Sequence, residues 1–261
     1  MRELFDEAYG QGGLDPEEAV RSSTRGPQRK RFHTRAGFSA AGSDFAITLD
    51  DKTVRTPSRK PLIAPSAELA ASIAAEWDAQ IDFINPMTMP LTRLANSVID
   101  AVDGNVDAVV EDIAKYFGTD LLFYRAGHPQ ELVAREAAAW DPLLFWAAQT
   151  FGAHFMLAEG IIHVRQPDAA IAAMRAELPT DPWTVAALHL VTTITGSALL
   201  AVALLRGRLD ADQVWTAAHV DEDWNIDRWG VDEEVAHRRA SKLVDFRAAA
   251  AVLKALAPPT G

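Results

Sequence analysis

The fold class can be inferred from residues 31–57, RFHTRAGFSAAGSDFAITLDDKTVRTP, and from the helical pattern that follows them. Short runs that contain β-branched and aromatic residues favour strands, and Asp and Gly favour the turns between strands. The expected strands are Arg31–Thr34, Phe45–Leu49 and Thr53–Arg55, with Asp50-Asp51 as a hairpin turn. This segment therefore predicts a small antiparallel β-meander.

The spacing of apolar residues changes at residues 66–81, SAELAASIAAEWDAQI. Leu69, Ile73 and Trp77 recur every four residues, which places them on one face of a helix. Ser66 is a favourable residue for the N-cap of that helix. The pattern predicts a helix with one buried face, and it makes Trp77 a residue that supports the fold.

From residue 91 onward nearly all of the chain has helical periodicity, interrupted by Gly and Pro. The expected helices are Thr92–Val102, Val106–Phe117, Pro129–Gly152, Asp168–Leu178, Pro182–Leu205, Asp210–Trp224 and Asp232–Leu256, and the expected short strands are Leu121–Tyr124 and Ile161–Val164. The sequence thus predicts an α+β protein with three parts. These are a flexible lead at 1–28, a small N-terminal β-rich antiparallel domain at 29–90, and a larger, mainly α-helical bundle domain at 91–261.

Composition narrows the classes of function. The chain has no Cys, which excludes disulfides, thiolate catalysis and thiolate metal sites. Its net charge is −11, and most of the negative charge lies after residue 65, which argues against nucleic acid as a partner. The first 18 residues are rich in acids and have no apolar core, unlike a secretory signal or a mitochondrial transit peptide. We therefore expect a bacterial cytoplasmic protein.

The uncharged stretch from Trp183 to Leu205 is long enough to cross a membrane. It contains several polar residues, among them His189 and Thr192, and no second span is present to cover them. A helix that is apolar on all sides is also what the centre of a helical bundle requires. We expect a buried helix and no stable insertion into a membrane.

The strongest candidate for a polar site is the acidic segment at residues 219–237, which begins HVDEDWNIDRWGVDEE. His219, Asp221 and Asp223 alternate, as oxygen-rich metal ligands do in a loop, but on a helix alternate residues point in different directions. Three interpretations remain open: a solvated helix end, a docking surface for a basic partner, or a metal site of a hydrolase or lyase. The segment has no HExxH pattern, so we expect no metal site.

Other motifs of catalysis are incomplete. The seven His have no ligand spacing, and Ser197 lacks the second glycine of a nucleophile elbow. Gly196 is expected to allow two helices to approach closely. Gly10-Gln11-Gly12-Gly13 lacks the Lys-Ser/Thr of a phosphate loop. We therefore expect no catalytic residues and no cofactor, which favours binding over catalysis.

Eight blocks, in order, carry a resemblance to a known family. They are RKRFH at 29–33, LDDKTVRTP at 49–57, EWDAQ at 76–80, MPLTRLANSVID at 89–100, DLLFYRA at 120–126, WDPLLFW at 140–146, TTITGSALLAVALLRGRL at 192–209 and HVDEDWNIDRWG at 219–230. The chain resembles the alpha-subunit-binding assembly chaperones of the F-type ATP synthase catalytic headpiece. No single block is diagnostic, but the blocks together cover most of the chain.

The resemblance implies a non-enzymatic chaperone that binds unassembled ATP synthase alpha subunit and prevents its aggregation until it pairs with beta subunit. Such a protein is expected to be a monomer when free. The resemblance also points to partner contacts through the acidic segment: Glu222 first, supported by Asp221, Asp223 and Asp227. An alternative for Glu222 is a helix cap or an internal ion pair with Arg228.

The same block suggests a structural motif of Trp229 and Gly230. Trp229, like the other tryptophans, is expected to lie in the core. Asn225 stands where many members of the family are expected to have Gln, and this departure leaves the acidic residues intact.

Overall fold

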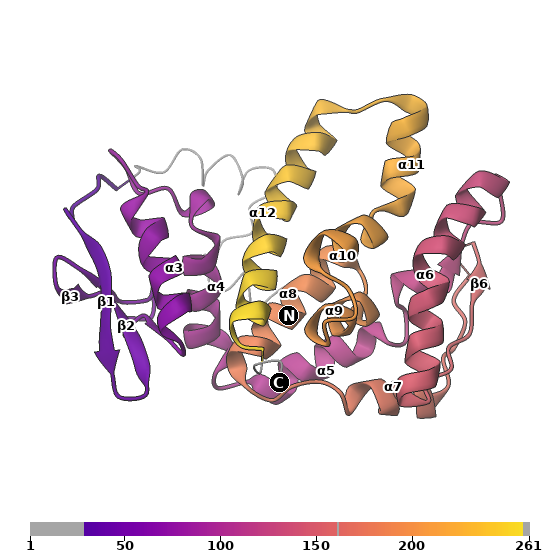
Figure 1. The fold of residues 1–261 in the computed structure, drawn as a ribbon, viewed down its shortest axis with the longest axis horizontal. Coiled ribbons are helices and arrows are strands. Elements are labelled where there is room, and N and C mark those ends of the chain that lie inside the picture. The colour runs from indigo at the N-terminus through magenta and orange to yellow at the C-terminus, as the bar shows by residue number, and fades with distance from the viewer. Residues whose placement is uncertain (1–28, 161, 258–261) are drawn as a thin grey trace, which may run out of the picture. The chain divides into compact units, whose positions relative to one another are not determined.

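The protein is described by a computed structural model for residues 29–160 and 162–257, so the expected lead at 1–28 lies outside the described residues. The chain divides into two compact units, Met1–Gly104 and Asn105–Gly261, called here the N-terminal unit and the C-terminal unit. A small antiparallel sheet belongs to the first, and helices make up most of the second (Figure 1). The expected α+β class, with a small antiparallel region before a larger helical one, is confirmed.

Strand β2 (Asp44–Leu49) is the centre of the sheet in the N-terminal unit. It pairs antiparallel with β1 (Ala36–Ala41), in a register that runs from Ala36 opposite Leu49 to Ala41 opposite Asp44. The short strands β3 (Lys52–Thr53) and β4 (Ile63–Ala64) also pair antiparallel with β2. The expected turn at Asp50-Asp51 is confirmed, because both residues have the positive φ angles, 47° and 65°, that a tight hairpin turn requires.

The expected strand at Arg31–Thr34 is wrong. Beside it Lys30 forms an isolated bridge with Phe83, and the Arg31 amide donates to the Asp82 carbonyl oxygen at 2.9 Å, but no ladder continues through Arg31–Thr34. The Arg31 guanidinium donates to the carbonyl oxygens of His33 and Thr34, both at 2.9 Å. The actual strand, β1, starts at Ala36; its sequence AGFSAA has no β-branched residue, so the propensity pattern did not indicate it.

Helix α3 (Ala67–Asp78) packs on the sheet and also fixes the helix that follows it. The Ser66 hydroxyl caps α3, as expected, by accepting from the Leu69 amide at 3.2 Å. The Glu76 carboxylate accepts the amides of Leu91 and Thr92, at 2.7 and 2.8 Å, in the first turn of α4 (Pro90–Ser97). A carboxylate from one helix therefore caps the N-terminus of another, where negative charge is favourable.

The cap on the N-terminus of α4 explains why the N-terminal unit extends beyond residue 90. The expected domain boundary lay at residue 90, whereas the compact unit extends to Gly104. Beyond α4, the π-helical turn η2 (Val98–Val102) is tied to the loop between β3 and β4: Thr56 donates its hydroxyl proton to Asp100 at 2.7 Å. The helices at 90–102 therefore pack with the β-rich part, whereas periodicity alone groups them with the helices that follow.

The C-terminal unit contains the remaining elements. They are α5 (Val106–Tyr116), η3 (Leu121–Phe123), β5 (Tyr124–Arg125), α6 (Gln130–Phe151), β6 (Ala158–Glu159), α7 (Asp168–Arg175), α8 (Pro182–Thr195), α9 (Ala198–Leu205), α10 (Ala211–Ala218), α11 (Val220–Trp229) and α12 (Glu233–Ala255). A 3-10 turn, η1 (Pro86–Thr88), precedes α4 in the N-terminal unit. The short strands β5 and β6 pair in parallel, at 124–125 and 158–159. Of the strand expected at 161–164, residue 161 lies outside the described residues, and residues 162–164 are not in a strand.

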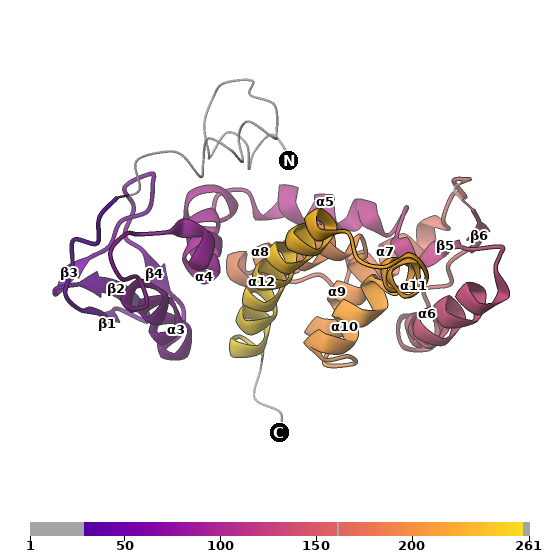
Figure 2. The same ribbon diagram turned by 90° about the horizontal axis from the view of Figure 1, so that it is seen from above.

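The expected single helix at 182–205 is two helices, α8 and α9. Gly196 separates them with a φ of 70°, and Ser197 then caps α9 by accepting from the Leu200 amide at 3.0 Å. Helix α8 packs between α5 and α12, and α9 contacts α8, α10 and α12 (Figure 2). Most residues of α8 and α9 are buried. Within the described ranges, no helix is long and apolar enough to cross a membrane.

Asp120, a fully buried carboxylate, supports this break. It accepts the Leu122 amide at 3.1 Å and the Leu199 amide at 3.0 Å, so one side chain caps both η3 and α9. Burial raises its pKa to about 6, although the hydrogen bonds that it accepts act in the opposite direction. The break between α8 and α9 is therefore stabilised by a buried side chain of the core.

Candidate functional site

The acidic segment at 219–237 is not the end of one helix, as its sequence suggests. It contains the cap of α10, all of α11 and the start of α12. Helix α10 ends at His219, α11 begins at Val220, and Asp232 caps α12 through the amides of Glu234 and Val235. The expected helix Asp210–Trp224 is thus broken in its middle. In the C-terminal unit, α11 and α12 form a hairpin of helices, with Gly230 in the connection at a φ of 84° (Figure 1).

Asp221 faces the buried side of α11 and meets Glu136 of α6. Glu136 is only 2 % exposed and accepts the Ala126 amide at 2.9 Å. Burial raises the pKa of Glu136 to about 7, and the hydrogen bond and charge of Asp221 add to that increase. The Asp221 Oδ1 atom is buried and has no hydrogen-bond partner among the described residues. The raised pKa favours a protonated Glu136, which can donate a hydrogen bond to the Asp221 carboxylate between α6 and α11.

Two ion pairs on the surface hold the same two helices together. Asp227 accepts from the Arg135 guanidinium at 2.7 Å, and Arg228 pairs with Glu131. Arg228 also lies over the ring of Trp224, with its guanidinium carbon 5.2 Å from the ring centre. The alternative of an ion pair between Arg228 and Glu222 is thereby contradicted, because Arg228 is directed toward α6 and Glu222 is not.

Asp223 is directed away from α6, toward α12. It pairs with Arg239 at 2.5 Å, and the guanidinium of Arg239 also lies 5.9 Å from the ring centre of Trp215. The side chains of Asp221, Asp223 and Asp227 therefore meet three different intramolecular partners. Within residues 29–160 and 162–257, no group of three His, Asp or Glu side chains is arranged to hold a metal ion.

Glu222 differs from its three acidic neighbours. Its side chain is 52 % exposed, and its nearest cationic candidate is the His219 Nε2 atom at 3.9 Å. His219 is buried against Trp215, with ring centres 3.9 Å apart, and its Nδ1 lies 2.7 Å from the Trp215 carbonyl oxygen. Burial lowers the pKa of His219, so the ring is neutral at pH 7 and the charge of Glu222 is not compensated there.

Comparison with known proteins assigns the chain to a family. A family model described as ATP12 chaperone protein matches residues 30–148. The crystal structure of Atp12 from Paracoccus denitrificans is 39 % identical, with a TM-score of 0.79 over 87 % of this chain and 97 % of that one. The chain belongs to the ATP12 chaperone family.

Two further matches agree with this assignment. The crystal structure of the Atu1473 protein of Agrobacterium tumefaciens is 44 % identical, with a TM-score of 0.85 over 98 % of this chain and 97 % of that chain. Protein atp12, mitochondrial, of Schizosaccharomyces pombe is 22 % identical over 87 % of this chain and 82 % of its own length. The ATP12 family model ends before α11, whereas the match to the Atu1473 structure covers 98 % of the chain and so includes α11.

In this member of the ATP12 family, the residues that were expected to support the fold have different surroundings from those that the sequence suggested. The expectation that Trp229 lies in the core is wrong: its side chain is 82 % exposed, because α11 packs on α6 through its other face. Trp77 is half-buried on α3, and its indole nitrogen is buried without a hydrogen-bond partner. Gly196 and Gly230 both have positive φ angles at helix ends; nothing packs closely on Gly230, and a Cβ at Gly196 would meet Leu121 at 3.8 Å.

Sequence reasoning missed the residues of α6 and α12 that orient the acidic cluster. They are Glu131, Arg135, Glu136 and Arg239. A signal for Glu136 was present: it lies four residues before Trp140, so a helix that buries Trp140 carries the carboxylate on the same face. Its partner on α11 could not be identified without the packing of the two helices.

Proposed function

We propose that this ATP12-family protein holds the unassembled alpha subunit of ATP synthase and keeps it from aggregating until it pairs with beta subunit. Membership of a chaperone family supports a protein client. The choice of α11 as the contact surface rests on one observation, a difference between its acidic residues. Asp221, Asp223 and Asp227 have partners inside the protein, whereas Glu222 is exposed and uncompensated.

The surface around Glu222 fits a partner that is both basic and apolar. Glu222 and Trp229 are seven residues apart on α11, about two helical turns, and so lie on one face of the helix. Trp229 is 82 % exposed, and Val231 and Val235 beyond it are also exposed. An exposed Trp beside a carboxylate is typical of a binding hot spot, and the acidic body would steer a basic partner toward it.

In this proposal the protein is not an enzyme. The acidic residues that could have formed a metal-dependent hydrolase site are directed toward α6, toward α12 and toward solvent, so they do not converge on one point. The absence of Cys fits a reducing compartment such as the bacterial cytoplasm. The free protein is proposed to be a monomer, for which light scattering after gel filtration should give 28.4 kDa.

The test is suppression of alpha-subunit aggregation. Purified alpha subunit is warmed with one equivalent of the chaperone, and light scattering is followed with time. Wild type should suppress scattering, and Glu222→Lys should lose most of that effect, because reversing one charge in an interface commonly costs a factor of ten or more in affinity. Native folding of the variant is checked by its circular dichroism and melting temperature.

Glu68→Lys is the matched control. Glu68 is an exposed acid in the first turn of α3, as Glu222 is in the first turn of α11, so both substitutions remove the same favourable interaction with a helix N-terminus. Glu68→Lys should suppress aggregation as wild type does. If wild type does not act on alpha subunit, the proposed client is wrong. If both variants act like wild type, the α11 surface is not the contact.

A further inference from the structure

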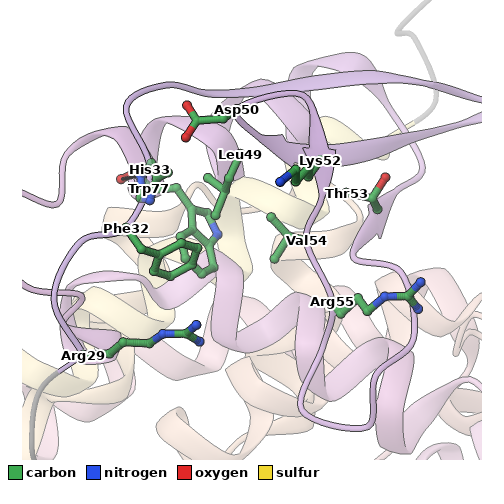
Figure 3. Close-up of a pocket in the computed structure, with 10 residues that line it drawn as sticks. All are labelled: Arg29, Phe32, His33, Leu49, Asp50, Lys52, Thr53, Val54, Arg55 and Trp77. Atoms are coloured by element: carbon green, nitrogen blue, oxygen red, sulfur yellow. Dashed lines mark hydrogen bonds between the residues drawn. The ribbon is translucent and has the colours of Figure 1, made fainter.

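A cavity of about 410 Å³ opens in the N-terminal unit, in a part of the protein that the proposed contact on α11 does not use (Figure 3). Its walls come from three places: the segment that enters the sheet, with Phe32 and His33; the turn and loop after β2, with Lys52 and Val54; and Trp77 of α3. A volume of this size is in the range of sites that take small ligands or a few residues of a peptide.

Two polar atoms of the cavity lining are buried without a hydrogen-bond partner. They are the His33 Nδ1 and the Trp77 Nε1. His33 is only 6 % exposed, and its Nε2 lies 3.1 Å from the Trp77 carbonyl oxygen. Because a carbonyl only accepts, Nε2 carries the proton, and Nδ1 of the neutral ring is left as an acceptor. The cavity thus offers one N–H donor and one acceptor, with the two rings 5.9 Å apart between centres.

One donor and one acceptor are the groups that the C=O and N–H of a peptide backbone can pair with. Unpartnered buried polar groups cost free energy, so a ligand that satisfies both gains that free energy on binding. In Figure 3 the indole nitrogen of Trp77 lies on the edge of the ring that faces Val54, another residue of the cavity lining.

The charges at the rim favour an acidic ligand. Arg29, Lys52 and Arg55 line the cavity, and among the described residues none of them forms an ion pair with a carboxylate. The one acidic lining residue, Asp50, is already engaged: it accepts the amides of Arg35 and Thr34 at 2.9 and 3.0 Å. These hydrogen bonds lower the pKa of Asp50. Three cationic side chains and one occupied carboxylate therefore line the cavity.

An apolar surface completes the site. Phe32 is 52 % exposed, and the guanidinium of Arg29 lies 4.3 Å from its ring centre. Leu49 and Val54 line the cavity beside Trp77. A ligand that carries an apolar side chain next to an acidic one would contact both kinds of surface.

We propose that this cavity binds an extended, acidic peptide segment of a partner protein. The indole N–H of Trp77 donates to a backbone carbonyl of the segment, and His33 Nδ1 accepts a backbone N–H. An apolar side chain packs on Phe32 and Val54, and a neighbouring carboxylate pairs with Lys52 or Arg55. This site does not depend on the identity of the client or on the contact through Glu222.

The test is a titration of ¹⁵N-labelled full-length protein with one acidic probe peptide, acetyl-Gly-Asp-Leu-Glu-Phe-Gly-amide. The readout is the NMR signal of the Trp77 indole N–H, assigned as the one lost in Trp77→Phe. We expect a saturable downfield shift of this signal, because a new acceptor would bind it. The matched peptide with Asn and Gln in place of Asp and Glu should bind at least about tenfold more weakly.

Charge-reversed variants complete the test. Lys52→Glu/Arg55→Glu changes two exposed side chains, and it should weaken binding of the acidic peptide at least about tenfold while the fold is kept. Arg208→Glu/Lys242→Glu, two exposed cations of the C-terminal unit, makes the same change in net charge and should bind as wild type does. No saturable shift, or equal binding of the two peptides or of the two double variants, would overturn the proposal.

Discussion

Glu136 of α6 and Asp221 of α11 bring two carboxyl groups together, and this contact favours the protonated form of Glu136. Glu136 is 2 % exposed and has a pKa raised by burial to about 7, and Asp221 has a buried Oδ1 atom without a hydrogen-bond partner among the described residues. The pair anchors the inner face of α11 to α6, where Arg135 pairs with Asp227 and Glu131 pairs with Arg228 nearer the solvent. This anchoring leaves Glu222 and Trp229 on the outer face.

The raised pKa of Glu136 predicts a pH dependence of stability. Glu136 has an ordinary pKa of 4.5 in the unfolded chain and about 7 in the folded protein, so between these values the folded state binds a proton that the unfolded state has released. The free energy of unfolding therefore falls as the pH rises from about 4.5 to about 7. Glu136→Gln keeps the acceptor for the Ala126 amide and gives Asp221 a permanent donor.

The variant Glu136→Gln should match wild type near pH 5 and exceed its stability at pH 8, by up to about 3 kcal/mol. Urea unfolding at pH 5, 6, 7 and 8 measures the difference. A difference between the two proteins that is the same at all four values would show that Glu136 does not titrate in this range.

The surface pair Arg135–Asp227 is expected to add little to stability, because both side chains are about half exposed, at 49 % and 58 %. Asp227→Arg should lower the free energy of unfolding by about 1 kcal/mol, and the exchange Arg135→Asp/Asp227→Arg should restore most of it. A measurement of client binding distinguishes two possible roles of Asp227, an ion pair within the protein and a contact with the client. If the exchanged pair restores stability and also client binding, Asp227 acts only within the protein and is not a contact residue.

Trp229 and Trp140 should respond in opposite ways to truncation. Trp229 is 82 % exposed, so Trp229→Ala should leave the melting temperature unchanged and weaken suppression of alpha-subunit aggregation. Trp140 is fully buried and donates its indole N–H to the Ala217 carbonyl oxygen at 2.7 Å. Trp140→Ala should cost about 3–5 kcal/mol of stability. Loss of folding in Trp229→Ala would contradict the assignment of this residue to a free surface.

Gly196 should be sensitive to substitution for reasons of backbone conformation. Its φ is 70°, and a Cβ there would meet Leu121 at an ordinary contact distance of 3.8 Å. Gly196→Ala should therefore cost about 1 kcal/mol through the left-handed backbone alone. Gly104→Ala is the control, since Gly104 has no positive φ and open space around it. Chemical unfolding of both variants gives the comparison, and equal stabilities would show that the break between α8 and α9 tolerates a Cβ.

The local patterns of the sequence predicted those features that depend on near neighbours. Ser66 and the four-residue spacing of Leu69 and Ile73 indicated α3, and the pair Asp50-Asp51 indicated its turn. The breaks at Gly196 and His219 were missed, because α8 and α9 are both apolar and α10 and α11 both have helical periodicity. In the first case the buried carboxylate of Asp120, distant in the sequence, supplies the second cap.

The sequence by itself determined the α+β class, the family resemblance and the acidic character of residues 219–237, because composition, short periodic patterns and motif order are local properties of the chain. Only the tertiary structure decided which acid on α11 is available to a partner. Asp221 lies against Glu136, and Asp223 and Asp227 form ion pairs with Arg239 and Arg135; these three partners come from two other helices. A charge is free or paired according to what packs against it, and that depends on contacts between residues far apart in the sequence.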